Sequence, residues 1–161
     1  MTCFASSKSL SGFRLVEKYG LVVGGGATHR YDLSQMVMLK DNHITSAGGI
    51  ANAVRAAKRV AGFSMKIEVE ASNYEQAEEA ANAGADVVML DNFEPVELKS
   101  VSRRLKDEYP HTLLEASGGI TAKTFHLFLI DSVDVISQGA LTHGYPCLDF
   151  SLKIAAKQSS T

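Results

Sequence analysis

Short apolar runs alternate with amphipathic segments along most of the chain. The runs are rich in β-branched residues and are apolar at consecutive positions, which is typical of parallel strands covered on both faces. The pattern predicts six such strands. They span residues 21–23, 36–40, 66–70, 86–91, 112–117 and 133–138.

The segments between these runs have the features of helices. Residues 50–61 carry apolar side chains at helical spacing and are followed by Gly62, a common helix stop. Ser72 and Glu75 fit a capping box for a helix over 73–83. Further helices are expected over 95–109, with Pro95 in the first turn, over 122–130, capped by Thr121, and over 150–157, capped by Asp149.

Alternation of strand and helix predicts right-handed βαβ units and one parallel sheet. The repeat lengths fit either an incomplete (β/α) barrel or an open doubly wound sheet. The 161 residues suit one domain, and a net charge of −2 gives no overall attraction to nucleic acid or to a membrane surface. Two cysteines, Cys3 and Cys147, are too few for a disulfide framework and indicate a cytoplasmic location.

Polar residues end five successive strands of the predicted sheet. In a (β/α) barrel the carboxyl ends of the strands meet on one face, where active sites are built. Any one of these residues alone is most simply a solvated strand end. Together they predict a site in which cations hold an anionic substrate and carboxylates hold a metal or sugar hydroxyls. The residues are Lys40, Glu70, Asp91, Ser117 and Ser137.

Two of the late strand ends continue into glycines. Gly118 and Gly119 follow Ser117, and Gly139 follows the next strand. Backbone N–H groups in such loops can bind an anion, and barrels often hold phosphate in the loops of their last strands. The alternative for each loop alone is a tight turn.

A cationic pair, His29 and Arg30, follows a glycine-rich loop. The loop lacks the spacing of a dinucleotide fingerprint, so we interpret the pair as substrate-binding, with an exposed polar turn as the alternative. His43 is a possible metal ligand, but no clustered Cys/His spacing supports it. The residues alone therefore indicate a barrel-like α/β enzyme for a phosphorylated, strongly anionic substrate.

Six segments in this order resemble the quinolinate phosphoribosyltransferase family, the carboxylating nicotinate-nucleotide pyrophosphorylases. They are GFRLVEKYGLVVGGGATHRYDL, MLKDNHI, KIEVEA, ADVVMLDNF, LEASGGIT and VDVISQGALTH. The resemblance implies an open, incomplete (β/α) barrel of about six parallel strands. It also implies an Mg²⁺-dependent enzyme of NAD biosynthesis that converts quinolinate and phosphoribosyl pyrophosphate into nicotinate mononucleotide, pyrophosphate and CO₂, and that forms a homodimer or larger homo-oligomer.

The resemblance also assigns roles to individual positions. Lys8, Lys40, Glu70 and Asp91 match catalytic positions, and Glu70 and Asp91 face magnesium and the ribose hydroxyls. The residues that match positions binding quinolinate carboxylates or phosphate are His29, Arg30, Lys40, Ser117, Gly118, Gly119 and Gly139.

Residues 1–11 depart from the family pattern, because Ser7 and Ser11 replace an arginine and a proline. We expect an atypical segment over 1–11 and the phosphoribosyltransferase barrel domain over 12–161, without the α/β domain that precedes this barrel in the family. One alternative to the enzyme is a non-catalytic form that binds a phosphorylated ligand or pairs with full-length subunits. A decarboxylase or phosphosugar isomerase of the barrel type fits the motifs less well.

Overall fold

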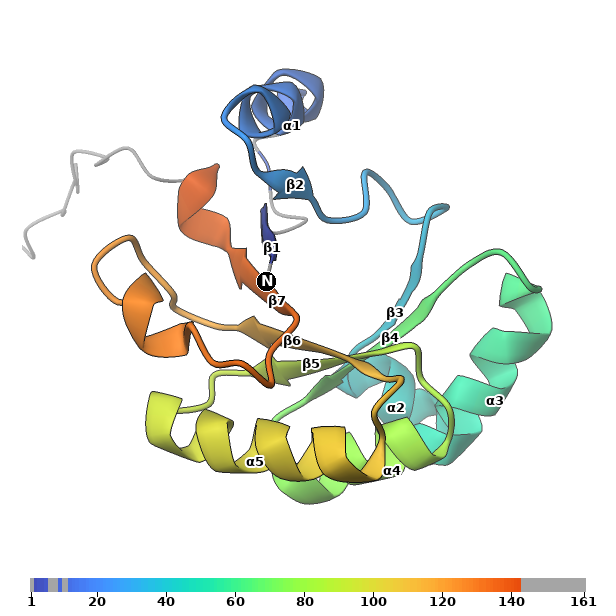
Figure 1. The fold of residues 1–161 in the computed structure, drawn as a ribbon. Coiled ribbons are helices and arrows are strands. Elements are labelled where there is room, and N and C mark those ends of the chain that lie inside the picture. The colour runs from blue at the N-terminus through green and yellow to red at the C-terminus, as the bar shows by residue number, and fades with distance from the viewer. Residues whose placement is uncertain (1, 6–8, 10–11, 143–161) are drawn as a thin grey trace, which may run out of the picture.

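The computed structural model describes residues 2–5, 9 and 12–142. Seven parallel strands form one sheet in the order β2-β1-β7-β6-β5-β4-β3, with β2 and β3 at its two ends (Figure 1). The strands are β1 (Thr2–Ala5), β2 (Ala27–Thr28), β3 (Val37–Leu39), β4 (Ile67–Ala71), β5 (Val87–Asp91), β6 (Leu113–Ser117) and β7 (Val135–Gln138). The helices are α1 (Arg14–Val23), α2 (Asp41–Ala47), α3 (Ile50–Ala61), α4 (Tyr74–Asn82), α5 (Pro95–Glu108) and the short 3₁₀ helices η1 (Phe125–Phe128) and η2 (Gly139–Leu141).

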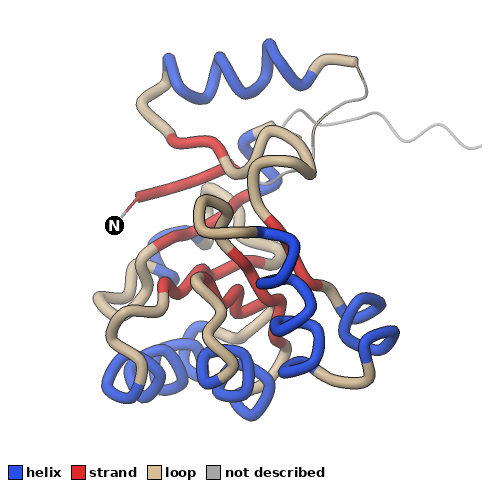
Figure 2. The backbone as a smooth tube through the Cα atoms, turned by 90° about the vertical axis from the view of Figure 1, so that its right-hand side faces the viewer, coloured by secondary structure: helices blue, strands red, loops and turns tan. Residues whose placement is uncertain are grey.

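The predicted α/β class is confirmed, and the sheet curls as an open, incomplete barrel does (Figures 1 and 2). Five of the six predicted strands are present, namely β3 to β7. The two short strands β1 and β2 were not predicted.

The main core lies between the sheet and the helices α3, α4 and α5. Residues alternate along each strand, so Val69, Leu90 and Ile136 point outward and are fully buried in this core. Leu98 and Leu105 of α5 complete this layer and are fully buried. The opposite positions of the same strands point into the curl of the sheet, and they are the ones that carry polar groups.

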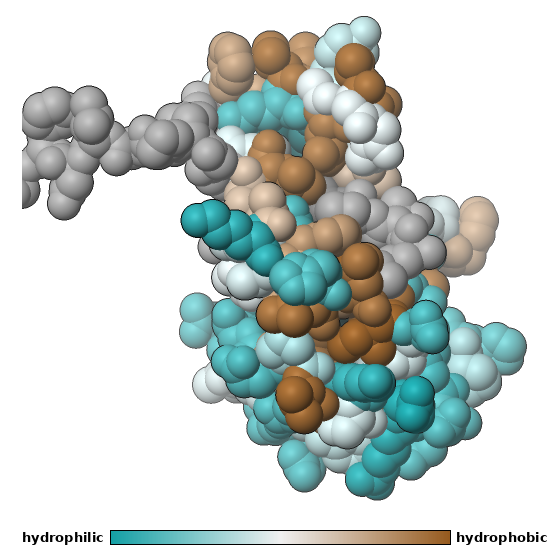
Figure 3. All heavy atoms as spheres, turned by 60° about the vertical axis from the view of Figure 1, so that its left-hand side comes forward, coloured by the Kyte–Doolittle hydropathy of each residue, from teal (hydrophilic) through white to brown (hydrophobic). Residues whose placement is uncertain are grey.

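The predicted strand over 21–23 is wrong, because these residues end helix α1. Leu15, Tyr19 and Val22 recur at helical spacing, which outweighs the β propensity of the LVV run. Their side chains are exposed, whereas the side chain of Lys18 is buried. The helix stands apart from the others at the β2 end of the sheet (Figure 2), and apolar side chains gather over it in the space-filling view (Figure 3).

The predicted helix over 50–61 is confirmed, with Gly62 at its end at a positive φ of 65°. The predicted helix over 95–109 begins at Pro95 as expected. Over 122–130 the chain forms only the 3₁₀ helix η1, which leaves Leu127 and Leu129 half exposed. The helix expected over 150–157, with its cap Asp149, lies outside the described residues. Helix α2 was not predicted. Within the described part of the chain, no helix is both long and apolar enough to span a membrane.

The predicted capping box of α4 is wrong by one residue. The cap is Asn73, whose side-chain oxygen accepts a hydrogen bond from the backbone N–H of Gln76 at 2.9 Å. Ser72 donates through its backbone N–H and its hydroxyl to the Gln76 side chain at 2.9 and 3.0 Å, so it supports the cap from outside the helix.

We therefore predict that Asn73→Ala lowers the free energy of unfolding by about 1 kcal/mol, the usual contribution of an N-cap side chain. Ser72→Ala is the matched control and should lower it by less than half as much, because its backbone donor remains. Urea denaturation of both variants checks this. A larger loss for Ser72→Ala would restore Ser72 as the cap.

Candidate functional site

A cavity of about 470 Å³ opens at the carboxyl ends of the strands. It collects eight of the predicted site residues from elements far apart in the sequence. They are His29, Lys40, Glu70, Asp91, Ser117, Gly118, Gly119 and Gly139. Met38, Met89 and Ser137, which point inward from β3, β5 and β7, also line the cavity.

The charges at neighbouring strand ends pair with one another. Lys40 Nζ lies 2.6 Å from Glu70 Oε2 across the ends of β3 and β4. The Lys40 side chain is half exposed, so the pair adds little to stability, and its cation remains accessible from the cavity. Opposite charges at the neighbouring ends of β3 and β4 thus lie side by side in the cavity and partly neutralise each other.

The loops after β5 and β6 are locked together. Asn92 has a left-handed backbone, φ 60°, and its N–H donates to Ser117 O at 2.9 Å. Its side-chain amide donates to Asp91 Oδ2 at 2.6 Å and so orients that carboxylate. A Cβ at Gly118 would lie 2.6 Å from Asn92 N and 2.8 Å from Asn92 Cα, so this position accepts only glycine.

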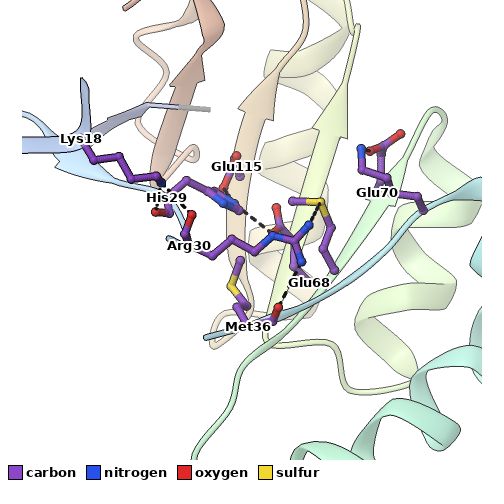
Figure 4. Close-up of polar contacts among 9 residues, drawn as sticks. Lys18, His29, Arg30, Met36, Glu68, Glu70 and Glu115 are labelled. Carbon is purple, nitrogen blue, oxygen red and sulfur yellow. Dashed lines mark hydrogen bonds and ion pairs between the residues drawn. The ribbon is translucent and has the colours of Figure 1, made fainter. Parts of the chain in front are cut away.

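Two carboxyl groups and one imidazole are buried deeper in the curl of the sheet (Figure 4). His29 Nε2 lies 3.1 Å from Glu68 Oε2 and 3.8 Å from Glu115 Oε2. Burial raises the pKa of Glu115 to about 7, and the nearby Glu68 carboxylate adds to this rise, while His29 and a hydrogen bond with Ser137 oppose it. Glu115 therefore keeps its proton to a higher pH than an ordinary glutamate, and below about pH 7 this proton limits the net negative charge of the cluster.

Lys18 fixes the segment that carries His29. Its buried ammonium donates to the carbonyl oxygens of His29 and Arg30, each at 2.7 Å (Figure 4). Burial, and then the charges of Arg14 and Arg30, lower the pKa of Lys18. Helix α1, whose apolar side chains are mostly exposed, thus positions the His29 segment through the ammonium of Lys18.

Of the predicted pair, His29 lines the strand-end cavity and Arg30 does not. The Arg30 guanidinium donates to Met36 O at 3.2 Å and contacts Met38 Sδ at 3.6 Å. It lines a second cavity of about 160 Å³ near the starts of the strands instead of the strand-end cavity. Lys8 lies outside the described residues. His43 Nδ1 accepts the Lys40 backbone N–H at 3.0 Å, which gives it a structural role at the start of α2.

Oxygen donors for a hard cation are present at the strand ends. Glu70 and Asp91 come from adjacent strands and line the same cavity, which suits Mg²⁺. The donor atoms of His29, Glu68 and Glu115 lie within 4.8 Å of one another, a spacing that a metal could also use. The short His29–Glu68 contact is also a hydrogen bond, so the three groups form a hydrogen-bonded cluster in this structure.

Sequence reasoning missed Glu68, Glu115 and Lys18. A signal was available for the two carboxylates, since each interrupts an otherwise apolar strand two positions before a strand-end residue, Glu70 or Ser117. Alternation along a strand places both members of each pair on the same inner face. Lys18 gave no such signal, because its burial depends on how α1 turns toward β2.

An open parallel barrel with glycine loops and carboxylates at its strand ends defines a class of enzymes that bind phosphorylated substrates. Within this class, the chain belongs to the quinolinate phosphoribosyl transferase family, whose C-terminal domain model matches residues 1–153.

Similar proteins agree with this assignment. The human nicotinate-nucleotide pyrophosphorylase [carboxylating] is 55% identical over 151 residues, which cover 94% of this chain and 51% of the human protein. The Dictyostelium discoideum protein of the same name is 57% identical over 147 residues, 91% of this chain and 49% of that protein. The crystal structure of NadC from Streptococcus pyogenes superposes with a TM-score of 0.82 at 38% identity, covering 95% of this chain and 53% of that one. The chain thus spans about half the length of the relatives it matches.

The raised pKa of Glu115 predicts a pH-dependent stability. Because the folded protein holds this proton from pH 4.5 up to about 7 and the unfolded chain does not, the contribution is full below 4.5 and is lost as the pH rises through about 7. Between about pH 5 and about pH 8 the free energy of unfolding should fall by roughly 2 kcal/mol more in the wild type than in Glu115→Gln. Urea denaturation at both pH values measures the difference, and equal falls would contradict the buried proton.

Proposed function

We propose that this chain carries the site at which phosphoribosyl pyrophosphate and quinolinate react to give nicotinate mononucleotide, pyrophosphate and CO₂. The strand-end cavity is the observation that carries the proposal, because it combines Lys40, the carboxylates Glu70 and Asp91, and two glycine loops at one edge of the sheet. The names of the relatives support the same reaction.

The 5-phosphate would bind at the loops after β6 and β7. Gly118, Gly119 and Gly139 line the cavity there, and glycines let backbone N–H groups approach an anion closely. Ser117 belongs to the same loop. The ribose hydroxyls would face Glu70 and Asp91, the two carboxylates that also suit Mg²⁺.

The quinolinate carboxylates would face Lys40 and His29, which both line the cavity. Lys8 remains a predicted member of this group. Arg30 also remains one, but its guanidinium would have to leave Met36 O to reach the cavity.

The reaction needs positioning and charge more than it needs a nucleophile from the protein. As the bond between the sugar C1 and the pyrophosphate breaks, positive charge develops on the ribose and negative charge on the leaving group. The pyridine nitrogen then bonds to C1. Magnesium, when bound, would neutralise pyrophosphate charge, and Lys40 would add to that neutralisation. Loss of CO₂ leaves an electron pair on the ring carbon next to the positively charged nitrogen.

The rest of the assignment extends beyond the cavity. We propose a cytoplasmic homodimer or larger homo-oligomer, in which neighbouring parts cover the cavity and exclude water. The exposed apolar side of α1, with Leu15, Tyr19 and Val23 more than two-thirds exposed, is available for such cover.

The direct test measures pyrophosphate release and CO₂ release by the purified chain, with quinolinate, phosphoribosyl pyrophosphate and Mg²⁺, and with each omitted in turn. The proposal predicts release of both products in the complete mixture alone. Binding of both substrates without any release would support the non-catalytic alternative, and absence of binding would contradict both.

We predict that Lys40→Ala weakens quinolinate binding by about 10- to 100-fold, which corresponds to about 1.5–3 kcal/mol for one charge-assisted contact. Lys99→Ala is the matched control, because Lys99 is exposed on α5 and does not line the cavity. Isothermal calorimetry checks both. Equal affinities in the two variants would remove Lys40 from the site.

We further predict that Gly119→Ala weakens binding of phosphoribosyl pyrophosphate about tenfold or more, because a methyl group enters the phosphate loop. Gly118 is unsuitable for this test, since its substitution would displace Asn92. Gly62→Ala is the control for the cost of a side chain at positive φ, because the φ values are 59° at Gly119 and 65° at Gly62 and neither added Cβ has a neighbour within 4 Å. Calorimetry on both variants separates loss of the phosphate site from general strain. If Gly119→Ala binds as well as Gly62→Ala, the phosphate lies elsewhere.

A further inference from the structure

The strand-end cavity and the smaller cavity at the strand starts share two lining residues, His29 and Glu115. The first cavity is the proposed reaction site. The second is bounded by the opening residues of the inner strands, among them Val87, Leu113 and Val135. The buried His29–Glu115 contact therefore forms the boundary between the reaction site and a second opening on the opposite side.

Glu115 is built to hold a proton at this boundary. Among the described residues, it is faced by Glu68 from β4, by His29 from the segment after β2 and by Ser137 from β7, while its neighbour in register on β5 is the uncharged Met89. Lys18 lies one step further away, on the carbonyl oxygen of His29. The burial and the Glu68 charge favour the neutral acid, and the Glu115 Oε1 atom has no hydrogen-bond partner within the described part of the protein.

The proposed reaction requires such a proton. When the bond between the ring carbon and its carboxylate breaks, CO₂ leaves and the electron pair stays on the ring carbon. This ring carbon must receive a proton to form its new C–H bond. Because water is excluded from the proposed site, an acidic side chain has to supply that proton. Among the described residues at the strand ends, Lys40 pairs with Glu70, and both Glu70 and Asp91 are assigned to magnesium and the ribose, which leaves the deeper Glu115 as the candidate donor.

We propose that Glu115 is the proton donor for the decarboxylated ring carbon. Glu68 is a positioning residue whose charge keeps Glu115 protonated, and His29 is a positioning residue that contacts Glu115 at the edge of the strand-end cavity. This inference rests on the proposed function. In the step, the Glu115 O–H bond breaks with its electron pair left on oxygen, and the proton and the carbanion pair form the new C–H bond. Water at the second cavity then returns a proton to the Glu115 carboxylate, which restores the donor without opening the reaction site.

The first experiment needs no ligand. In protein labelled with carbon-13 at the glutamate side-chain carboxyls, the resonance that disappears in Glu115→Gln belongs to Glu115. We expect it to titrate at about pH 7 in the wild type and at lower pH in Glu68→Gln, because removal of the Glu68 charge lowers the pKa of Glu115. Titration of Glu115 near its ordinary value of 4.5 would overturn the inference, as would displacement of its proton by added Zn²⁺ at neutral pH, which would indicate a metal site.

The second experiment uses the reverse of the protonation step. In D₂O, nicotinate mononucleotide bound to the protein should exchange one ring hydrogen for deuterium. This hydrogen is on the carbon between the ring nitrogen and the carbon that bears the carboxylate, and proton NMR follows its loss. We expect Glu115→Gln to slow this exchange about a hundredfold, a usual effect of removing a general acid or base, whereas the exposed control Glu97→Gln on α5 leaves it unchanged. In Glu68→Gln, the midpoint of the pH dependence of this exchange should move to lower pH, together with the midpoint of the Glu115 titration.

The outcomes separate this inference from the proposed function. Equal exchange in the wild type and Glu115→Gln, or no exchange in the wild type, overturns the donor. If the wild type exchanges this hydrogen but releases no pyrophosphate from quinolinate and phosphoribosyl pyrophosphate, the proposed function fails while the donor stands. If the wild type releases pyrophosphate and CO₂ but does not exchange this hydrogen, the proposed function stands and Glu115 is not the donor.

Discussion

The buried contact of His29 with Glu68 and Glu115 is the interaction on which the site depends. Two carboxylates shut away from water need a cation, a proton or both, because an unpaired buried charge costs several kcal/mol. Here one imidazole and one retained proton meet that need. The loop that carries His29 must therefore stay in place, and the buried Lys18 of α1 holds it by two carbonyl oxygens.

The same alternation that buries these groups also exposes the reactive ones. On β4, Glu68 and Glu70 share the inner face, but Glu68 is fully buried while Glu70 reaches the cavity and pairs with Lys40. On β6, Glu115 and Ser117 have the same relation, and Gly118 and Gly119 follow. The inner face thus has two levels, an upper ring of exposed charge for an anionic ligand and a lower level that stores a proton.

The residues at the strand ends could be predicted from the sequence, whereas the deeper carboxylates Glu68 and Glu115 were not predicted. Lys40, Glu70 and Asp91 stand at the ends of recognisable strands, so parallel order alone predicts that they meet. The place of Arg30 could not be predicted, because adjacency to His29 in sequence says nothing about which cavity each side chain enters. Helix α1 was misread for a related reason, since its apolar side is exposed and its one buried side chain, Lys18, is charged.

A crystal structure of this chain with bound nicotinate mononucleotide tests the central claim most directly, because the product occupies the site without turnover. The account predicts that the phosphate lies against the backbone N–H groups of Gly118, Gly119 and Gly139, with the ribose hydroxyls at Glu70 and Asp91. It also predicts that the ring lies on the inner side of the cavity. The ring carbon between the nitrogen and the carboxylate-bearing carbon should then face Glu115. A nucleotide bound outside the strand-end cavity, or bound there with the phosphate toward Lys40 and the ring toward the glycine loops, would contradict it.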